Sequence, residues 1–229
     1  MLARPVFSLC WSPRWETCSV QLPPPYPLLL LRRWRNLVLG ATGAFRHAEV
    51  SDRARSLSEH WDANWSELGR AGNPKGPLSR RWVRFHSLPE SKRYADTGEE
   101  RAEILRRHVT VLRELGAGSE PVICIGDDWL DWGWTRKLLP AAWPWRVERD
   151  DERRPTYSWV QEFGSLAEIE PLLSAVAEEE AILALTNADA SWVYLPYDGG
   201  ADVYTSTEAQ CDELRARHSD WLSSQHKGL

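Results

Sequence analysis

The stretch RWVRFHSLPESKRY, residues 81–94, gathers side chains that could bind an anion. Lysine and arginine donors suit phosphate and carboxylate groups, and the N-terminus of a following helix would add backbone N–H donors. In the alternative interpretation, Pro89 ends a strand and the basic groups pair with acids of the C-terminal half. The pattern favours this alternative. The candidate ligand-binding residues of the stretch are Arg84, His86, Lys92, Arg93 and Tyr94.

A second candidate is the run PYDGGADVY, residues 196–204, which places Asp198 and Asp202 on either side of two glycines. Two carboxylates could perform acid–base chemistry or bind a hard metal ion. Glycines permit positive φ, so Gly199 and Gly200 predict a tight turn in which Asp198 bonds to its own backbone. The four-residue spacing fits no standard metal loop, so the turn is the favoured interpretation.

Other titratable residues carry less weight. Asp127, Asp128 and Asp131 match the Asp-Asp-x-x-Asp pattern of magnesium-diphosphate enzymes, but they follow a strand and have no second acidic motif. His108 lies on the apolar face of a predicted helix with no His or Cys four residues away, which is typical of a hydrogen-bonded core histidine. His218 is expected in solvent. The sequence therefore predicts no metal site and no cofactor.

Alternating helices and strands must position these groups. Ser51 predicts the start of one helix, and Thr97 with Glu100 forms a capping box before a second helix that Gly116 ends. Two further helices are predicted in residues 165–180 and 206–222, the second capped by Ser206 or Thr207. Strands are predicted in residues 80–88, 120–126, 155–163, 181–187 and 191–197, with extended chain after the glycines.

This order predicts an α+β or α/β single domain over residues 51–229. We expect a mixed or mainly antiparallel sheet of about four to six strands packed with about four helices. Residues 1–50 hold a proline-rich run and no sustained hydrophobic period, so we expect a disordered extension. Met1 is the only methionine. A second hypothesis is therefore that the functional protein starts at Val38 or Val50, and that the preceding residues are upstream sequence translated by mistake.

Charge is distributed unevenly along the 229 residues. Residues 1–118 carry 19 basic and 12 acidic side chains, whereas residues 119–229 carry 9 and 21, so the halves differ in sign at +7 and −12. The asymmetry suggests a protein partner with a basic surface, or a small anionic ligand. No basic run is dense enough to predict nucleic-acid binding.

Location follows from two absences in the sequence. The four cysteines show no zinc spacing, which fits a reducing, cytoplasmic location. No apolar run reaches the roughly 18 residues that would span a membrane. We therefore expect a protein without membrane contact.

The segments WVRFHSLPESKRYADTGEERAEILRRHVTVLREL, PYDGGADVY and RHSDWLSSQHKGL are similar to an uncharacterised bacterial family, the domain of unknown function catalogued as three-eight-eight-five. The resemblance covers roughly residues 57–229, with a looser middle from about 119 to 160. The family commonly has a YDD-R-G-x-D element, and Asp198, Gly200 and Asp202 match positions of that element. Gly199 differs, because it stands where the family has an acidic residue. The resemblance implies a small standalone soluble protein, without an established reaction, cofactor or ligand.

Two functions remain open from the sequence. The first, which is favoured, is a non-enzymatic binding or immunity-type module for a basic partner. The second is a small enzyme or sensor that acts on an anionic ligand, with the candidate residues of both stretches lining one site. The second hypothesis requires residues 92–94 and the two aspartates to meet in space.

Overall fold

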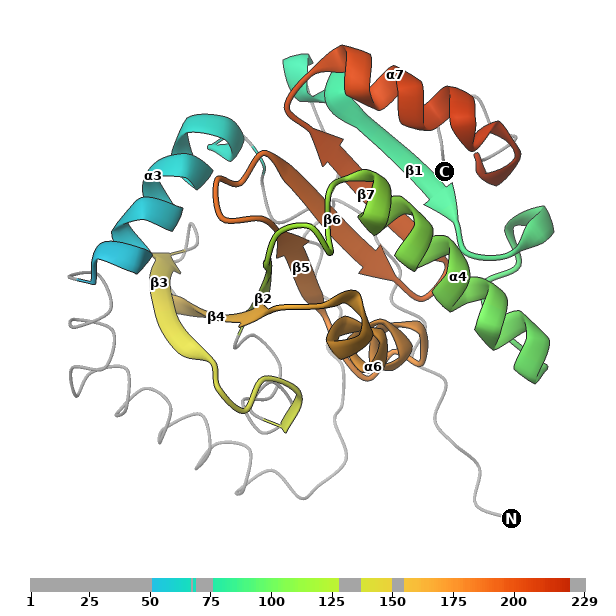
Figure 1. Ribbon diagram of the computed structural model, residues 1–229, viewed down its shortest axis with the longest axis horizontal. Helices are drawn as coiled ribbons and strands as arrows, with labels where there is room; N and C mark the ends of the chain where they lie inside the picture. The colour runs from blue at the N-terminus through green and yellow to red at the C-terminus, as the bar shows by residue number, and fades with distance from the viewer. Residues whose placement is uncertain (1–50, 67, 69–75, 128–136, 150–154, 223–229) are drawn as a thin grey trace, which may run out of the picture.

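The computed structural model describes residues 51–66, 68, 76–127, 137–149 and 155–222. The predictions for residues 1–50 and for Asp128 and Asp131 lie outside these ranges. Figure 1 shows a twisted sheet with helices packed on both faces. Among the described helices, none combines the length and the apolar character that crossing a membrane requires.

The sheet has seven strands, all paired antiparallel, in the order β1-β7-β6-β5-β2-β4-β3. The strands are β1 (Trp82–His86), β2 (Val122–Asp127), β3 (Trp143–Arg149), β4 (Pro155–Phe163), β5 (Leu183–Thr186), β6 (Trp192–Tyr197) and β7 (Gly200–Thr205). The α+β class is confirmed.

The expected four to six strands were too few, because no strand was predicted in the region of β3, Trp143–Arg149. Pro144 lies in β3, which is an edge strand and pairs only with β4. The lack of a backbone N–H at this proline therefore removes few hydrogen bonds from the sheet. The register also shifts between Pro144 and Arg146. These two irregularities hid the strand from a pattern search.

The helices follow their capping signals. Ser51 accepts a hydrogen bond from the Ala54 N–H at 3.1 Å, and Thr97 and Glu100 form the predicted capping box. Gly116 has the positive φ of 94° that a helix C′ residue adopts. The described α-helices are α3 (Asp52–Trp65), α4 (Gly98–Glu114), α6 (Leu166–Ala177) and α7 (Glu208–Arg217).

Each face of the sheet carries its own apolar core, because side chains alternate along the strands. Tyr194 of β6 and Val203 of β7 belong to the core beneath α4, α6 and α7. Their neighbours Val193 and Tyr204 belong to a second core that includes Trp61 of α3. The helices α4 and α7 therefore lie on the same face, above β6 and β7 (Figure 1).

Candidate functional site

The pairing of β1 with β7 brings the two candidate stretches together. Arg84 lies in register with Asp202, and His86 lies in register with Gly200. Beyond β1, the Ser87 N–H donates to the Gly199 carbonyl at 3.0 Å. The requirement that the two stretches meet is thus fulfilled, although they are more than a hundred residues apart in the chain.

Arg84 and Asp202 form a two-pronged ion pair. Nε of Arg84 lies 2.7 Å from Oδ1, and Nη2 lies 2.8 Å from Oδ2. Only 21% of the arginine side chain and 7% of the aspartate side chain are exposed. The Asp202 hydrogen bond raises the pKa of Arg84. The guanidinium also lies over the rings of Trp82 and Tyr197, at 5.4 and 5.5 Å from their centroids.

Arg93 pairs with Asp198, the other predicted carboxylate. Burial is the largest single influence on Asp198 and opposes its ionisation. The hydrogen bond from Arg93, the other hydrogen bonds of the group and the charge of Arg93 together outweigh burial, so the pKa of the carboxyl lies below its usual value. Glu179 completes this group, since it lies 3.5 Å from Arg93 Nη2 and accepts a hydrogen bond from the Tyr94 hydroxyl at 2.7 Å. The hydrogen bond to Glu179 raises the pKa of Tyr94 to about 12.

Lys92 faces away from this group and pairs locally. Its ammonium lies 2.8 Å from Asp96 and 2.6 Å from Glu100, and the hydrogen bond to Asp96 contributes most to raising its pKa. Every basic residue of the predicted anion site therefore has a carboxylate partner within the chain.

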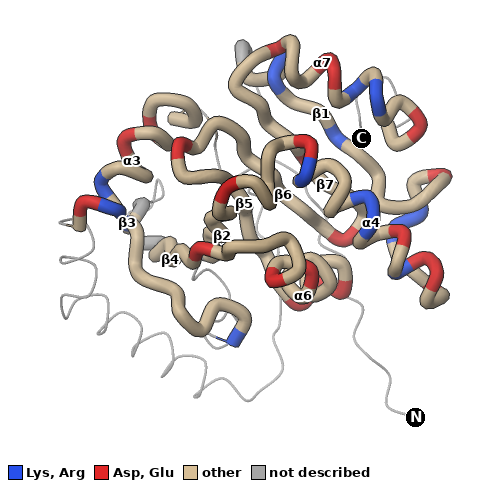
Figure 2. The backbone as a smooth tube through the Cα atoms, viewed as in Figure 1, with Lys and Arg blue, Asp and Glu red and all other residues tan. Residues whose placement is uncertain are grey.

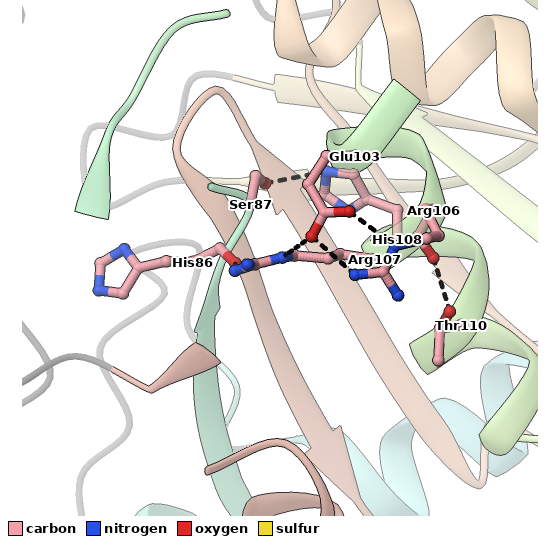
Figure 3. A network of polar contacts seen from close by, with 7 residues as sticks. All are labelled: His86, Ser87, Glu103, Arg106, Arg107, His108 and Thr110. Carbon is pink, nitrogen blue, oxygen red and sulfur yellow. Dashed lines mark hydrogen bonds and ion pairs between the residues drawn. The ribbon is translucent and has the colours of Figure 1, made fainter. Parts of the chain in front are cut away.

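His86 points to the side of β1 opposite α4, as Figure 3 shows. Its Nε2 is enclosed and has no hydrogen-bond partner, while its backbone carbonyl accepts from Arg107 Nη1 at 2.9 Å. Burial, followed by the charges of Arg84 and Arg107, lowers the pKa of the imidazole. His86 is therefore favoured in its neutral form at pH 7.

The predicted tight turn is present, because Tyr197 at the end of β6 pairs with Gly200 at the start of β7, but the backbone of its glycines differs from the prediction. Neither Gly199 nor Gly200 has a positive φ. A Cβ at Gly200 would overlap the Phe85 carbonyl oxygen, and a Cβ at Gly199 would lie 3.3 Å from the Tyr197 ring. Gly200 is required because β1 and β7 approach closely there, and only a residue without a side chain allows it.

A buried polar cluster that the sequence did not predict lies beside β1 (Figure 3). The two ring nitrogens of His108 lie 3.2 Å from the Ser87 hydroxyl and 2.6 Å from the Tyr194 hydroxyl. Burial lowers the pKa of His108 to about 4. As predicted, His108 is a hydrogen-bonded core residue. Among the described residues, no group of three metal-ligating side chains occurs.

His218 is buried, contrary to the expectation of solvent exposure. Its Nε2 lies 2.9 Å from Glu114 Oε2, and its ring stacks on Trp221 at 4.0 Å between centroids. The partner is 104 residues away in the chain, so no local pattern could indicate it.

The ion pairs leave a surplus of carboxylates at one surface, which we call the acidic surface: residues 90–101, residues 178–180 and Asp198. It carries eight carboxylates and three basic side chains, a difference of five. Contacts from Tyr94 to Glu179 and from Arg101 to Glu178, the latter at 3.5 Å, join the segments. Figure 2 shows acidic segments along the N-terminal part of α4.

Large apolar side chains are also exposed here. Tyr94 is 49% exposed, and Ile182, two residues beyond the 178–180 run, is 74% exposed. Of the seven candidate residues, only His86 lines either of the two best-formed cavities of the described chain, and that cavity measures about 10 Å³. A volume of that size holds no more than a single water molecule.

Comparison with known proteins supports the resemblance seen in the sequence. No curated protein and no solved structure matches the chain. One family model, described as "Domain of unknown function (DUF3885)", matches residues 75–226. The match includes both candidate stretches and all seven strands, and it covers more than half of the 229 residues. The chain therefore belongs to the DUF3885 family.

Proposed function

We propose that this protein is a non-enzymatic binding module of the immunity type, which neutralises a basic protein partner at the acidic surface. The observation that carries the proposal is the coincidence there of surplus carboxylates with the exposed ring of Tyr94, while the exposed Ile182 follows the 178–180 run in the chain. A reducing, cytoplasmic location fits the module, because Cys124 and Cys211 are buried free thiols.

The two kinds of side chain contribute differently to recognition. Surplus carboxylates attract a basic partner over several ångströms and raise the association rate, an effect that salt screens. Glu90 and Glu180 have no ion-pair partner among the described residues, so their charge is available. Tyrosine combines a large apolar ring with a polar tip and is enriched among the residues that anchor interfaces. Its hydrogen bond to Glu179 holds the Tyr94 ring in place before binding.

The alternative, an enzyme or sensor that acts on a small anionic ligand, has less support. Such a ligand would compete with Asp202 for Arg84 and with Asp198 for Arg93, and both carboxylates are at most 9% exposed in their side chains. Displacing a partly buried carboxylate leaves it without its counter-charge, which costs about 3 kcal/mol or more. The same ion pairs that hold the sheet together therefore disfavour the alternative hypothesis.

The test is capture of the partner from the native host at low and high salt. The full chain is compared with a variant that reverses three charges of the acidic surface, E178K/E179K/E180K. A matched control, E59K/E120K/E170K, makes the same charge change at exposed glutamates outside that surface. We expect a basic protein to be retained by the wild type and the control at about 50 mM salt and lost from the surface variant.

The captured protein is then purified, and its affinity is measured by calorimetry with each variant. Replacing Tyr94 with alanine is expected to weaken binding by about tenfold or more, because an interface tyrosine commonly contributes over 1 kcal/mol. The proposal fails if no basic protein binds, or if both triple variants bind it equally well.

A further inference from the structure

A groove of about 210 Å³ lies between α7 and the C-terminal end of α4, on the face of the sheet that both helices cover. Gln210, Glu213, Leu214 and Arg217 line one wall. Their spacing of three, four and seven residues places them on one side of α7. Trp192 of β6 and Thr205 of β7 contribute the floor, and Figure 1 shows α7 beside β1 and β7 and α4 next to it on the same face.

Most polar groups of the groove are already engaged by the protein itself. Glu114 Oε2 closes one end through Arg217 at 3.0 Å and His218 at 2.9 Å. The Thr205 hydroxyl donates to the Thr207 carbonyl at 2.8 Å. These contacts hold both walls in position. Because Arg217 and Thr205 already have partners within the protein, neither is the group that would select a ligand.

Two polar side chains remain available to a ligand. Glu213 is exposed and has no hydrogen-bond or ion-pair partner among the described residues. The amide of Gln210 accepts only one hydrogen bond at its oxygen, from the Thr207 hydroxyl at 3.2 Å. Both groups can accept hydrogen bonds from a cation, and they lie one turn apart on α7.

Apart from Ser191, whose hydroxyl donates to Asn187 at 3.2 Å, the remaining lining is apolar or aromatic. Leu214 is 4% exposed and Trp192 is also 4% exposed, while Leu115 at the end of α4 is half-buried. An aromatic floor and aliphatic walls suit a hydrocarbon stem, and an indole ring also attracts a nearby cation. With two carboxylates against one guanidinium, the lining carries a formal surplus of one negative charge.

We propose that this groove binds a small free alkylammonium compound, a diamine or related polyamine. Its ammonium group would donate to the Glu213 carboxylate and the Gln210 amide oxygen, and its hydrocarbon stem would lie against Trp192, Leu115 and Leu214. The volume of about 210 Å³ accommodates a linear diamine with a few ordered waters. The groove uses residues outside the acidic surface, so this inference does not depend on the proposed function.

The experiment titrates 1,4-diaminobutane into the isotopically labelled full chain and follows amide and indole N–H resonances by NMR. The Trp192 indole signal is assigned from the spectrum of Trp192→Phe. 1,4-Butanediol serves as a neutral ligand of the same length. Glu213→Gln removes the groove's available charge, and Glu208→Gln makes the same change on α7 outside the lining.

We expect the diamine, and not the diol, to shift residues of the groove in a saturable manner. Glu213→Gln should weaken the binding measurably, by up to about fivefold, while Glu208→Gln leaves it unchanged, because one exposed ion pair is worth up to about 1 kcal/mol. Thermal unfolding checks that both variants are folded. If Glu213→Gln is unfolded, the contrast between diamine and diol decides.

Three results would overturn the inference. The first is an absence of saturable shifts in the groove, and the second is equal binding by diamine and diol. The third is binding of Nα-acetyl-lysine amide without binding of the diamine, which would assign the groove to a lysine side chain of a protein instead.

Discussion

Arg84 and Asp202 face each other in register across β1 and β7, and both prongs of the guanidinium meet the carboxylate, at 2.7 and 2.8 Å. Asp202→Asn would leave the partly buried Arg84 without its counter-charge. We expect a loss of about 3 kcal/mol in the free energy of unfolding, measured by urea denaturation at pH 7. The exposed pair Arg215–Asp212 provides the control, where Asp212→Asn should cost about 0.5 kcal/mol or less. Equal effects of the two substitutions would contradict the structural role of the buried pair.

The free energy of unfolding should fall as the pH is lowered, over a range of pH that the protonation of His108 determines. Its folded pKa of about 4 lies below the usual 6.5, so the imidazole is neutral in both states above pH 6.5. Between pH 6.5 and 4 the unfolded chain binds the proton that the folded chain refuses, and the free energy of unfolding falls by about 3 kcal/mol.

The measurement is urea denaturation of the wild type and His108→Gln at pH 7, 6 and 5. The lowered pKa of His86 contributes a slope of the same sign, so the variant should keep a smaller dependence on pH. Arg107 and Glu103 are the charged neighbours of His108 on α4 (Figure 3), and the Glu103 carboxylate stays ionised in this range. The pKa of Glu103 is lowered to about 2, chiefly by its hydrogen bond from Arg106. A slope that is the same in both proteins would refute the assignment to His108.

The turn between β1 and α4 holds two non-glycine residues in the left-handed region. Glu90 has φ 56° and Ser91 has φ 58°, and the Lys92 N–H bonds to the Pro89 carbonyl at 3.1 Å. Asparagine and glycine adopt such dihedrals more readily. The double change E90N/S91G should therefore stabilise the protein by about 1 kcal/mol in thermal or urea unfolding. As the control, Ser174→Gly inside α6 should instead destabilise it.

Gly200 should tolerate no side chain. In Gly200→Ala the added Cβ would overlap the Phe85 carbonyl, and β1 would have to separate from β7. We expect a loss of about 3 kcal/mol or more. Gly98→Ala is the matched control, because nothing lies within 4 Å of a Cβ at this helical position, and it should be neutral or stabilising. Circular dichroism during heating distinguishes the two.

Local patterns predicted the parts of the fold that local forces determine. The capping box of Thr97 and Glu100 and the strand Pro155–Phe163 are confirmed at their predicted positions. These features depend on neighbours within four residues or on strict alternation. The strand β3 escaped because Pro144 is compatible with a strand only at a sheet edge, and edge position is a property of the complete sheet.

The candidate site shows the same limit. The sequence identified the basic and acidic side chains of the candidate site. It also favoured ion pairs between them over the binding of an anion. The partners of Arg84 and Arg93 lie 118 and 105 residues away, so their identities depend on the register of β1 with β7. Glu179, which joins Tyr94 to Arg93, lies in an ordinary acidic run with no signal of its own.

The strand order has a consequence for synthesis of the chain. β1 is the first strand of the sheet to leave the ribosome, yet its only neighbour in the sheet is β7, and its Phe85 bridges to Leu222. Until nearly the whole chain has emerged, β1 has no strand to bind and its apolar residues stay open to wrong associations. The stretch 81–94, which carries five of the seven candidate residues, thus begins with a strand that is made early and paired last.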